Sequence, residues 1–238
     1  MGGTQLNILA KNNYVLCMLL DMITEIKYAK YLKTINIIRN MEDSFCNETT
    51  PYDCPEPQIT SQEIDYTEAP KDIKTHMNIM GVIKPETKLK VFEFFKEHLD
   101  LDEEDYATMF HPKSYISSAA TIGHGVTVGP LTSVAPYAEL GNMVSVNRNV
   151  SIGHHTAIGD YSTINPGVNI AGCCKIGKNV FIGMGVNICD GIEIGDGTVI
   201  GAGSLVNKSV QGASTAWGFP AKTLKKENWN SRQIPKQF

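Results

Sequence analysis

The 238-residue sequence has few cysteines, few cationic residues after position 110 and no long apolar run. Its six cysteines show no disulfide framework, which suits a reducing compartment. The longest apolar run, Tyr14–Leu20, is too short to span a bilayer, and no charged segment with a cleavage site marks a secretory signal. The formal net charge of −4 leaves no large basic patch for nucleic acid. We therefore expect a cytoplasmic protein that binds neither membrane nor nucleic acid.

A period of six residues is the dominant pattern in this sequence. From Ile116 to Val206 a branched aliphatic residue stands at every sixth position, sixteen times without interruption. A small or β-branched residue follows most of them by four positions, and glycine often follows directly. A period of six fits no α-helix, and the glycine content also argues against one. It fits short parallel strands joined by tight corners, which is the hexapeptide type of β-helix.

The same period predicts which residues are neighbours in space. Three faces of six residues make a coil of eighteen, so residues eighteen apart lie one above another, separated by about 4.8 Å. Sixteen hexapeptides predict about five coils without an excursion loop. The aliphatic residues should fill a thin interior, and the residues four positions later should occupy tight corners.

The first 110 residues show a β/α pattern instead. Four strands are expected, at 5–10, 35–39, 77–83 and 106–110. Two helices are expected, at 14–28 and at 86–99, the second beginning after Pro85 and burying Leu89, Phe92, Phe95 and Leu99. Residues 46–72 are rich in proline, acidic and small polar residues, which predicts a loop. The sequence thus divides into an α/β domain over 1–110, a β-helix over 111–221 and a tail over 222–238. The first domain is either a cap on the β-helix or a nucleotide-sugar recognition domain.

The repeat region offers few side chains for acid–base chemistry, and its histidines are His124, His154 and His155. In an eighteen-residue coil, Gly172 lies directly above His154. A base would then stand beside a stretch without a side chain, where an extended ligand could reach the Gly172 backbone N–H. Acyl transfer requires such a base and such a donor about one strand apart. The simpler alternative is that His154 is one polar wall residue among many.

Three segments resemble the hexapeptide-repeat sugar acetyltransferases. They read VNRNVSIGHHTAIGD at 146–160, NPGVNIAG at 165–172 and GFPAK at 218–222. The branch they resemble acetylates amino sugars on nucleotide carriers, as in bacillosamine, perosamine and viosamine synthesis, and the sialic acid O-acetyltransferases belong to the same group. The resemblance is strong over 111–224 and holds only in outline over 5–110.

The resemblance implies a fold, an assembly and a set of site residues. The fold would be a left-handed parallel β-helix with a small N-terminal α/β domain, assembled as a homotrimer with acetyl-CoA between adjacent β-helices and no metal. His154 would be the general base of a direct attack without an acyl-enzyme. Residues implied for acetyl-CoA are Gly172, Met184, Ala202, Gly218, Pro220 and Lys222. Those expected near the sugar nucleotide are Asn147, His155, Lys11, Asn12 and Asn13.

Two positions depart from the family pattern. Where the family carries Asp or Glu directly after the histidine to orient its imidazole, this chain has His155. A carboxylate such as Asp160 or Glu139, or a backbone carbonyl, could take that role. The family's first strand also ends in a Gly-rich turn that receives the nucleotide, whereas residues 9–13 of this chain, LAKNN, contain no glycine.

The leading hypothesis is an acetyl-CoA-dependent N-acetyltransferase that acts on a nucleotide-linked 4-amino-4,6-dideoxyhexose. O-acetylation of a sugar hydroxyl, as in the sialic acid enzymes, is the alternative, because the same base would serve both. A hexapeptide carbonic anhydrase would need three histidines around zinc, but His124 falls in a different column from His154. A non-catalytic β-helix scaffold would leave His154 without a purpose and would not bind CoA.

Overall fold

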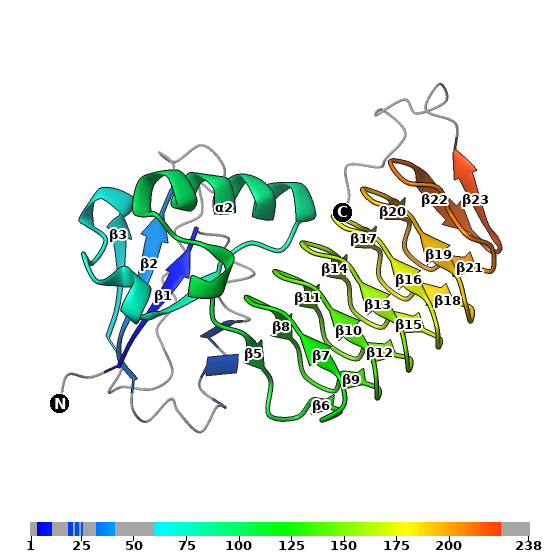
Figure 1. Ribbon diagram of the computed structural model, residues 1–238, viewed down its shortest axis with the longest axis horizontal. Coiled ribbons are helices and arrows are strands. Elements are labelled where there is room, and N and C mark those ends of the chain that lie inside the picture. Colours follow the sequence, from blue (N-terminus) through cyan, green and yellow to red (C-terminus); the bar gives the residue numbers. More distant parts are fainter. Residues whose placement is uncertain are drawn as a thin grey trace.

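The computed structural model describes residues 4–10, 19–20, 22–23, 25, 32–40 and 60–224. A small sheet and a helix stand at one end of a long stack of coils, and the hairpin β22–β23 closes the other end (Figure 1). Among the described residues, no helix is long and apolar enough to cross a membrane. The domain boundaries at 110 and 221 stay predictions.

The stack is a left-handed parallel β-helix, as predicted. Each of the sixteen aliphatic residues is the second residue of a two-residue strand. From Ile116 to Ile188, each of these strands pairs in parallel with the strand eighteen residues later, as Ile152 does with Ile170. No excursion loop interrupts the series. The strands are β5 (Met109–Phe110), β6 (Tyr115–Ile116), β7 (Thr121–Ile122), β8 (Thr127–Val128), β9 (Ser133–Val134), β10 (Glu139–Leu140), β11 (Ser145–Val146), β12 (Ser151–Ile152), β13 (Ala157–Ile158), β14 (Thr163–Ile164), β15 (Asn169–Ile170), β16 (Lys175–Ile176), β17 (Phe181–Ile182), β18 (Asn187–Ile188), β19 (Glu193–Ile194), β20 (Val199–Ile200), β21 (Leu205–Val206), β22 (Thr215–Gly218) and β23 (Ala221–Leu224).

These strands form three sheets, which meet at three corners. One sheet has eight strands (β23-β22-β20-β17-β14-β11-β8-β5), one has six (β21-β18-β15-β12-β9-β6) and one has five (β19-β16-β13-β10-β7). We call the bend from the eight- to the six-stranded sheet corner 1; it includes residues 147–150. Corner 2 leads from the six- to the five-stranded sheet, as at 153–156. Corner 3 leads from the five- to the eight-stranded sheet, as at 159–162.

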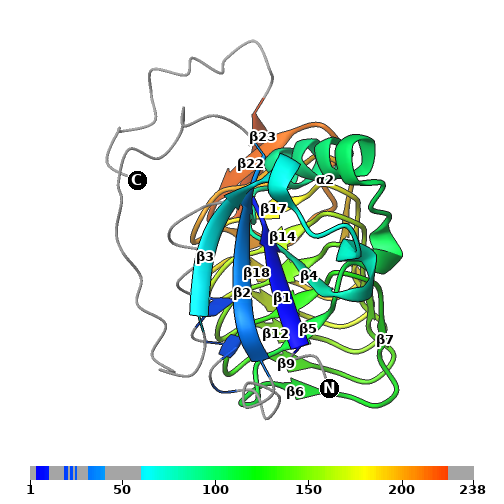
Figure 2. The ribbon, with the colours of Figure 1, turned by 90° about the vertical axis from the view of Figure 1, so that its left-hand side faces the viewer.

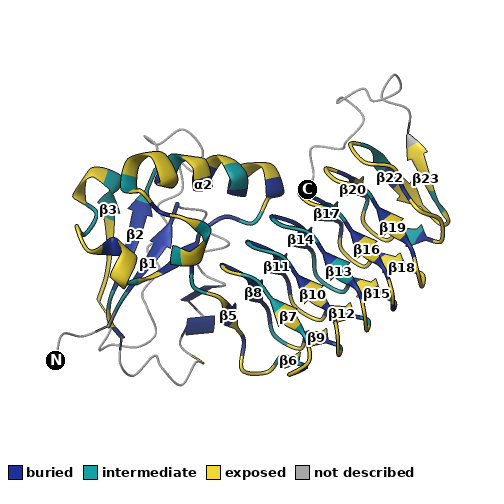
Figure 3. Ribbon diagram, in the orientation of Figure 1, coloured by how far each residue is buried: buried dark blue, intermediate teal, exposed yellow. Residues whose placement is uncertain are grey.

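Buried and exposed residues alternate along the coils (Figure 3), and the buried ones form an aliphatic interior, as the period predicts. Fourteen of the sixteen aliphatic residues are buried; Ile116 and Ile122 are only partly buried because their strands, β6 and β7, begin the six- and five-stranded sheets. The residues four positions later are also buried, from Val126 to Val210. Burial of each branched side chain stabilises the fold by about 1.5–3 kcal/mol.

The N-terminal sheet is parallel, with the order β3-β2-β1-β4 (Figure 2). Its strands are β1 (Thr4–Leu9), β2 (Leu32–Arg39), β3 (Thr60–Asp65) and β4 (Met77–Met80). A row of side-chain amides crosses it at one register: Gln62 donates to Asn36, Asn36 to Asn7 and Asn7 to Asn78, each at 2.8 Å. The three asparagines are buried, and the row satisfies their polar atoms inside the sheet.

Helix α2 (Pro85–Leu99) begins at the predicted proline and joins the sheet to the β-helix. It buries Val91, Phe92 and Phe95 among side chains of both parts, whereas Leu89 and Leu99, predicted as buried, are only partly so. Its most buried polar residue is Lys88, whose Nζ donates to Met143 O at 2.7 Å, to Ser162 O at 3.0 Å and to Ser145 Oγ at 3.3 Å. Burial holds the pKa of the Lys88 amine well below its ordinary value.

The loop predicted over 46–72 is wrong for its last part. Residues 60–65 form β3, and one-turn 3-10 helices follow at Tyr66–Glu68 and Ile73–Thr75. Strand β3 is an exposed edge strand, so it is held by backbone pairing with β2 and by the Gln62 amide rather than by an apolar pattern. The strands predicted at 77–83 and 106–110 are shorter than expected, at 77–80 and 109–110. Most of the helix predicted at 14–28 lies outside the described residues.

Candidate active site

Corner 2 carries the predicted base. His154 follows strand β12, and its side chain is exposed. A Cβ atom added to Gly172 would lie 2.7 Å from Cε1 and 2.8 Å from Nε2 of His154, so the imidazole lies directly on the glycine. The structure therefore brings His154 and Gly172 together, as the eighteen-residue coil predicts, and only a residue without a side chain leaves the ring this position.

The Gly172 backbone N–H already has a partner in this structure. It donates to Asp190 Oδ1 at 2.8 Å, from one coil further along the stack. The same device caps corner 3, where Asp160 accepts from the N–H of Asn142 at 2.9 Å. The free N–H expected from the sequence is therefore occupied, and an acyl oxygen could take this donor only by displacing the Asp190 carboxylate. Sequence reasoning missed this contact, although an acidic residue eighteen positions after a corner N–H is its signal.

The two adjacent histidines contact each other. The Nδ1 atoms of His154 and His155 are 3.1 Å apart, and the ring planes are nearly perpendicular, at 84°. His155 has a left-handed backbone with φ 55°, and its ring lies against Tyr137 with the centroids 4.9 Å apart. His155 was expected near the sugar nucleotide, and the structure places it beside the imidazole of the candidate base.

The carboxylates considered as partners of His154 lie elsewhere. Asp160 is at corner 3, where it forms an ion pair with Lys178 at 2.8 Å. Glu139 lies on strand β10, exposed, and among the described residues no ion pair joins a carboxylate to His154. The observed side-chain partner of His154 is therefore the imidazole of His155.

The residues implied for CoA lie mostly at corner 1, away from His154. Met184 and Ala202 follow strands β17 and β20 of the eight-stranded sheet, and the Met184 side chain is 56% exposed. Gly218 joins them, because its N–H donates to Ser204 Oγ at 3.1 Å. Pro220 follows in the β22–β23 turn, and Lys222 is exposed on β23, where it pairs with Trp217.

Asn147 is also at corner 1, buried, and its Oδ1 accepts from the N–H of Arg148 at 2.8 Å. Strand β12 separates it from His154 along the chain, and the two residues occupy different corners of the prism. A single chain thus divides the predicted site residues between two corners.

The predicted nucleotide contacts Lys11, Asn12 and Asn13 lie outside the described residues. The described chain reaches Ala10, which follows β1 with φ 68° and donates its N–H to Ile38 O at 2.9 Å. The turn after the first strand therefore enters the left-handed region without a glycine.

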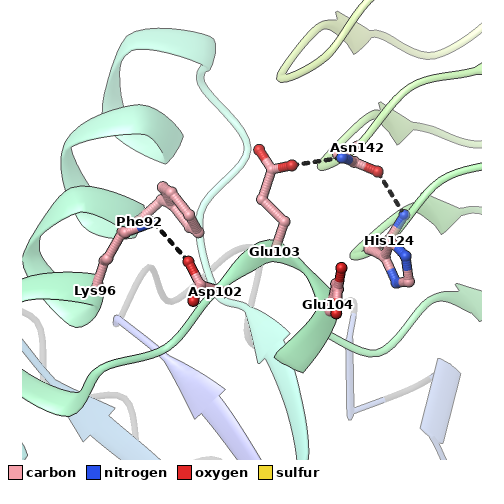
Figure 4. A pocket seen from close by; sticks show the side chains of 7 residues that line it. All are labelled: Phe92, Lys96, Asp102, Glu103, Glu104, His124 and Asn142. Atoms are coloured by element: carbon pink, nitrogen blue, oxygen red, sulfur yellow. Dashed lines mark hydrogen bonds and ion pairs between the residues drawn. The ribbon is translucent and has the colours of Figure 1, made fainter.

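His124 lies at corner 3 and lines a cleft of about 580 Å³ between α2 and the first coils (Figure 4). The cleft lining includes three acidic residues. One of them, Glu103, accepts hydrogen bonds from Asn142 Nδ2 at 2.5 Å and Tyr161 OH at 2.6 Å. The His124 backbone N–H donates to Asn142 Oδ1 at 2.8 Å, so a chain of hydrogen bonds runs along the cleft edge from His124 to Tyr161. Within the described ranges, no group of three or more His, Cys, Asp or Glu side chains is placed to hold a metal ion.

Comparisons with known proteins agree with this architecture. The bacterial transferase hexapeptide (six repeats) model matches residues 173–208, and no curated protein matches the chain by sequence. Three solved structures match it over nearly their whole lengths. They are the acetyltransferase domain of PglB from Neisseria gonorrhoeae FA1090 (19% identity, TM-score 0.75, 92% of this chain and 99% of that one), WeeI from Acinetobacter baumannii AYE (19%, 0.70, 93% and 99%) and a His-to-Asn variant of perosamine N-acetyltransferase from Caulobacter crescentus (17%, 0.69, 94% and 98%). The chain has the fold of these proteins. The shared fold includes the N-terminal sheet, because the matches extend well beyond the repeats.

Proposed function

We propose that this chain is an acetyl-CoA-dependent N-acetyltransferase whose substrate is a nucleotide-linked amino sugar, a 4-amino-4,6-dideoxyhexose. The observation that carries the proposal is the exposed His154 imidazole seated on Gly172. Two matched structures support the substrates, since the PglB domain was solved with acetyl coenzyme A and the perosamine enzyme with CoA and GDP-perosamine.

The proposed reaction needs one base and no covalent intermediate. The neutral sugar amine attacks the thioester carbon while Nε2 of His154 takes a proton from the nitrogen. The carbon–sulfur bond then breaks, and the CoA thiolate leaves with a proton returned by the imidazolium. General-base catalysis of this kind contributes about 10²–10⁴ in rate. An oxyanion contact to Gly172 belongs to this scheme only if Asp190 releases the N–H, for instance when acetyl-CoA binds.

The division of the site between two corners supports a homotrimer. His154 lies at corner 2, whereas Met184, Ala202 and Gly218 lie at corner 1. Prisms packed side by side would set corner 2 of one chain against corner 1 of the next, and acetyl-CoA would lie in the cleft between them. Exposed apolar side chains at both corners, such as Leu131 and Tyr137, suit such packing. We expect this assembly to act in the cytoplasm.

The test is thiol release from acetyl-CoA in the presence of a panel of nucleotide-linked amino sugars. We expect His154→Asn to lose at least about 100-fold in kcat while folding and assembly are retained. His124→Asn is the matched control, because His124 is exposed at the same hexapeptide position but at corner 3; it should keep full activity. Wild-type rates in His154→Asn would refute the base assignment. Release with hydroxyl sugars alone would replace N-acetylation by O-acetylation.

A further inference from the structure

The contact between His154 and His155 constrains where the protons of the pair reside. The Nδ1 atoms lie 3.1 Å apart, which is hydrogen-bond distance for two imidazole nitrogens. One of the two must then carry the shared proton and the other must accept it. If His154 donates, its Nε2 keeps a free lone pair; if His155 donates, Nε2 of His154 carries the proton and is no longer a base.

The surroundings fix the His155 ring in this contact. The His155 backbone N–H donates to Pro136 O at 3.3 Å, and the His155 ring lies against Tyr137 from the coil below. Cys173, eighteen residues after His155, lies above it in the next coil, and the Cys173 backbone N–H donates to His154 O at 2.8 Å. The Asp190 carboxylate, also at this corner, accepts a hydrogen bond from the Gly172 N–H. None of these supplies a carboxylate to either imidazole.

We propose that His155 is a positioning residue that accepts the Nδ1 proton of His154 and so holds His154 in the tautomer whose Nε2 is the base. This rests on the proposed function. The partner is neutral, which distinguishes it from a carboxylate. A carboxylate would stabilise the imidazolium form of His154, and the base would then be lost at a higher pH.

Three substitutions at one position separate these effects. Asn and Asp both place an oxygen where Nδ1 of His155 stands, and both tolerate its left-handed backbone. Ala removes the acceptor. We expect His155→Ala to lower kcat about 10- to 100-fold with little change in the KM for acetyl-CoA. His155→Asn should restore most of the rate. His155→Asp should also restore it, and should move the acid limb of kcat/KM about one unit to higher pH.

A readout without turnover uses the full chain labelled with ¹⁵N-histidine, with signals assigned through His154→Asn and His155→Asn. At pH 8 we expect His154 protonated at Nδ1 and His155 at Nε2. The reverse pattern would overturn the proposal, and so would an unchanged rate in His155→Ala, or a failure of both Asn and Asp to rescue it. If no sugar is acetylated, the proposed function fails, and the NMR tautomers still decide the role of His155.

Discussion

Replacing Gly172 by alanine tests directly whether the missing side chain at this position determines where the His154 ring lies. The new Cβ would lie 2.7–3.2 Å from three ring atoms of His154, whereas carbon atoms in contact prefer about 3.5–4.0 Å. The ring must therefore move by about 1 Å, and it can, because it is exposed. A misplacement of about 1 Å in a reacting group can cost about 100-fold in rate. We expect kcat/KM to fall by that factor, which is about 2.7 kcal/mol in the barrier.

The same substitution should leave the fold intact. Gly172 does not have a positive φ, and the three atoms nearest to the added Cβ all belong to the exposed His154 ring, so alanine adds no backbone strain. Alanine also keeps the N–H, which separates ring displacement from loss of a donor. Thiol release and thermal unfolding measured on one preparation provide the assay.

Gly197→Ala is the matched control, with the opposite signature. Gly197 lies at corner 3 with φ 64°, and a Cβ atom added there would lie 4.0 Å from the nearest atom, Ala213 Cα. Alanine there should cost about 1 kcal/mol of stability and no activity. Wild-type kcat/KM in Gly172→Ala would refute the reasoning, because a base that tolerates this displacement is not positioned by Gly172.

Two further predictions follow from other contacts. Asp190→Ala removes the acceptor of the Gly172 N–H and leaves this donor free for the acyl oxygen. We expect the KM for acetyl-CoA to fall in steady-state kinetics. An unchanged KM and kcat would show that Asp190 only caps the corner. Lys88→Met leaves the Met143 and Ser162 carbonyls without their donor and should lower the free energy of unfolding by about 2–3 kcal/mol at pH 7. Because the pKa of Lys88 is lowered in the folded state, the unfolded chain binds more protons between that value and the ordinary one. Wild-type stability should therefore rise with pH across this window, and denaturant titrations should show no such rise in Lys88→Met.

The repeat region could be predicted from the sequence because the period of six sets the length of each face, and three faces set the length of a coil. Counting eighteen residues placed Gly172 on His154, and the same count places Asp190 on Gly172. The hydrogen bond that Asp190 makes was missed because a period gives neighbours without giving side-chain directions. The His155 contact depends on a left-handed backbone at a non-glycine residue, which the period does not reveal.

The first 110 residues were harder to predict because polar contacts decide much of their structure. Strand β3 is polar and exposed, so no alternation of apolar residues marks it. In α2, Lys88 lies on the buried face, four residues before Phe92, and three oxygen acceptors from the β-helix surround its amine. Such partners lie more than fifty residues away and cannot be inferred from the local sequence.

The row of amides across the N-terminal sheet has a direction. Every member donates toward β4, and the last, Asn78, donates to the backbone carbonyls of Ile73 and Asp105 at 3.1 Å. A carbonyl can only accept, so the terminal contacts fix the orientation of Asn78 and, through it, of each amide up to Gln62. The dipoles consequently align and polarise one another. One polarity therefore runs through the side-chain amides of all four strands, and turning Asn36 or Asn7 alone would bring like atoms together on both of its sides.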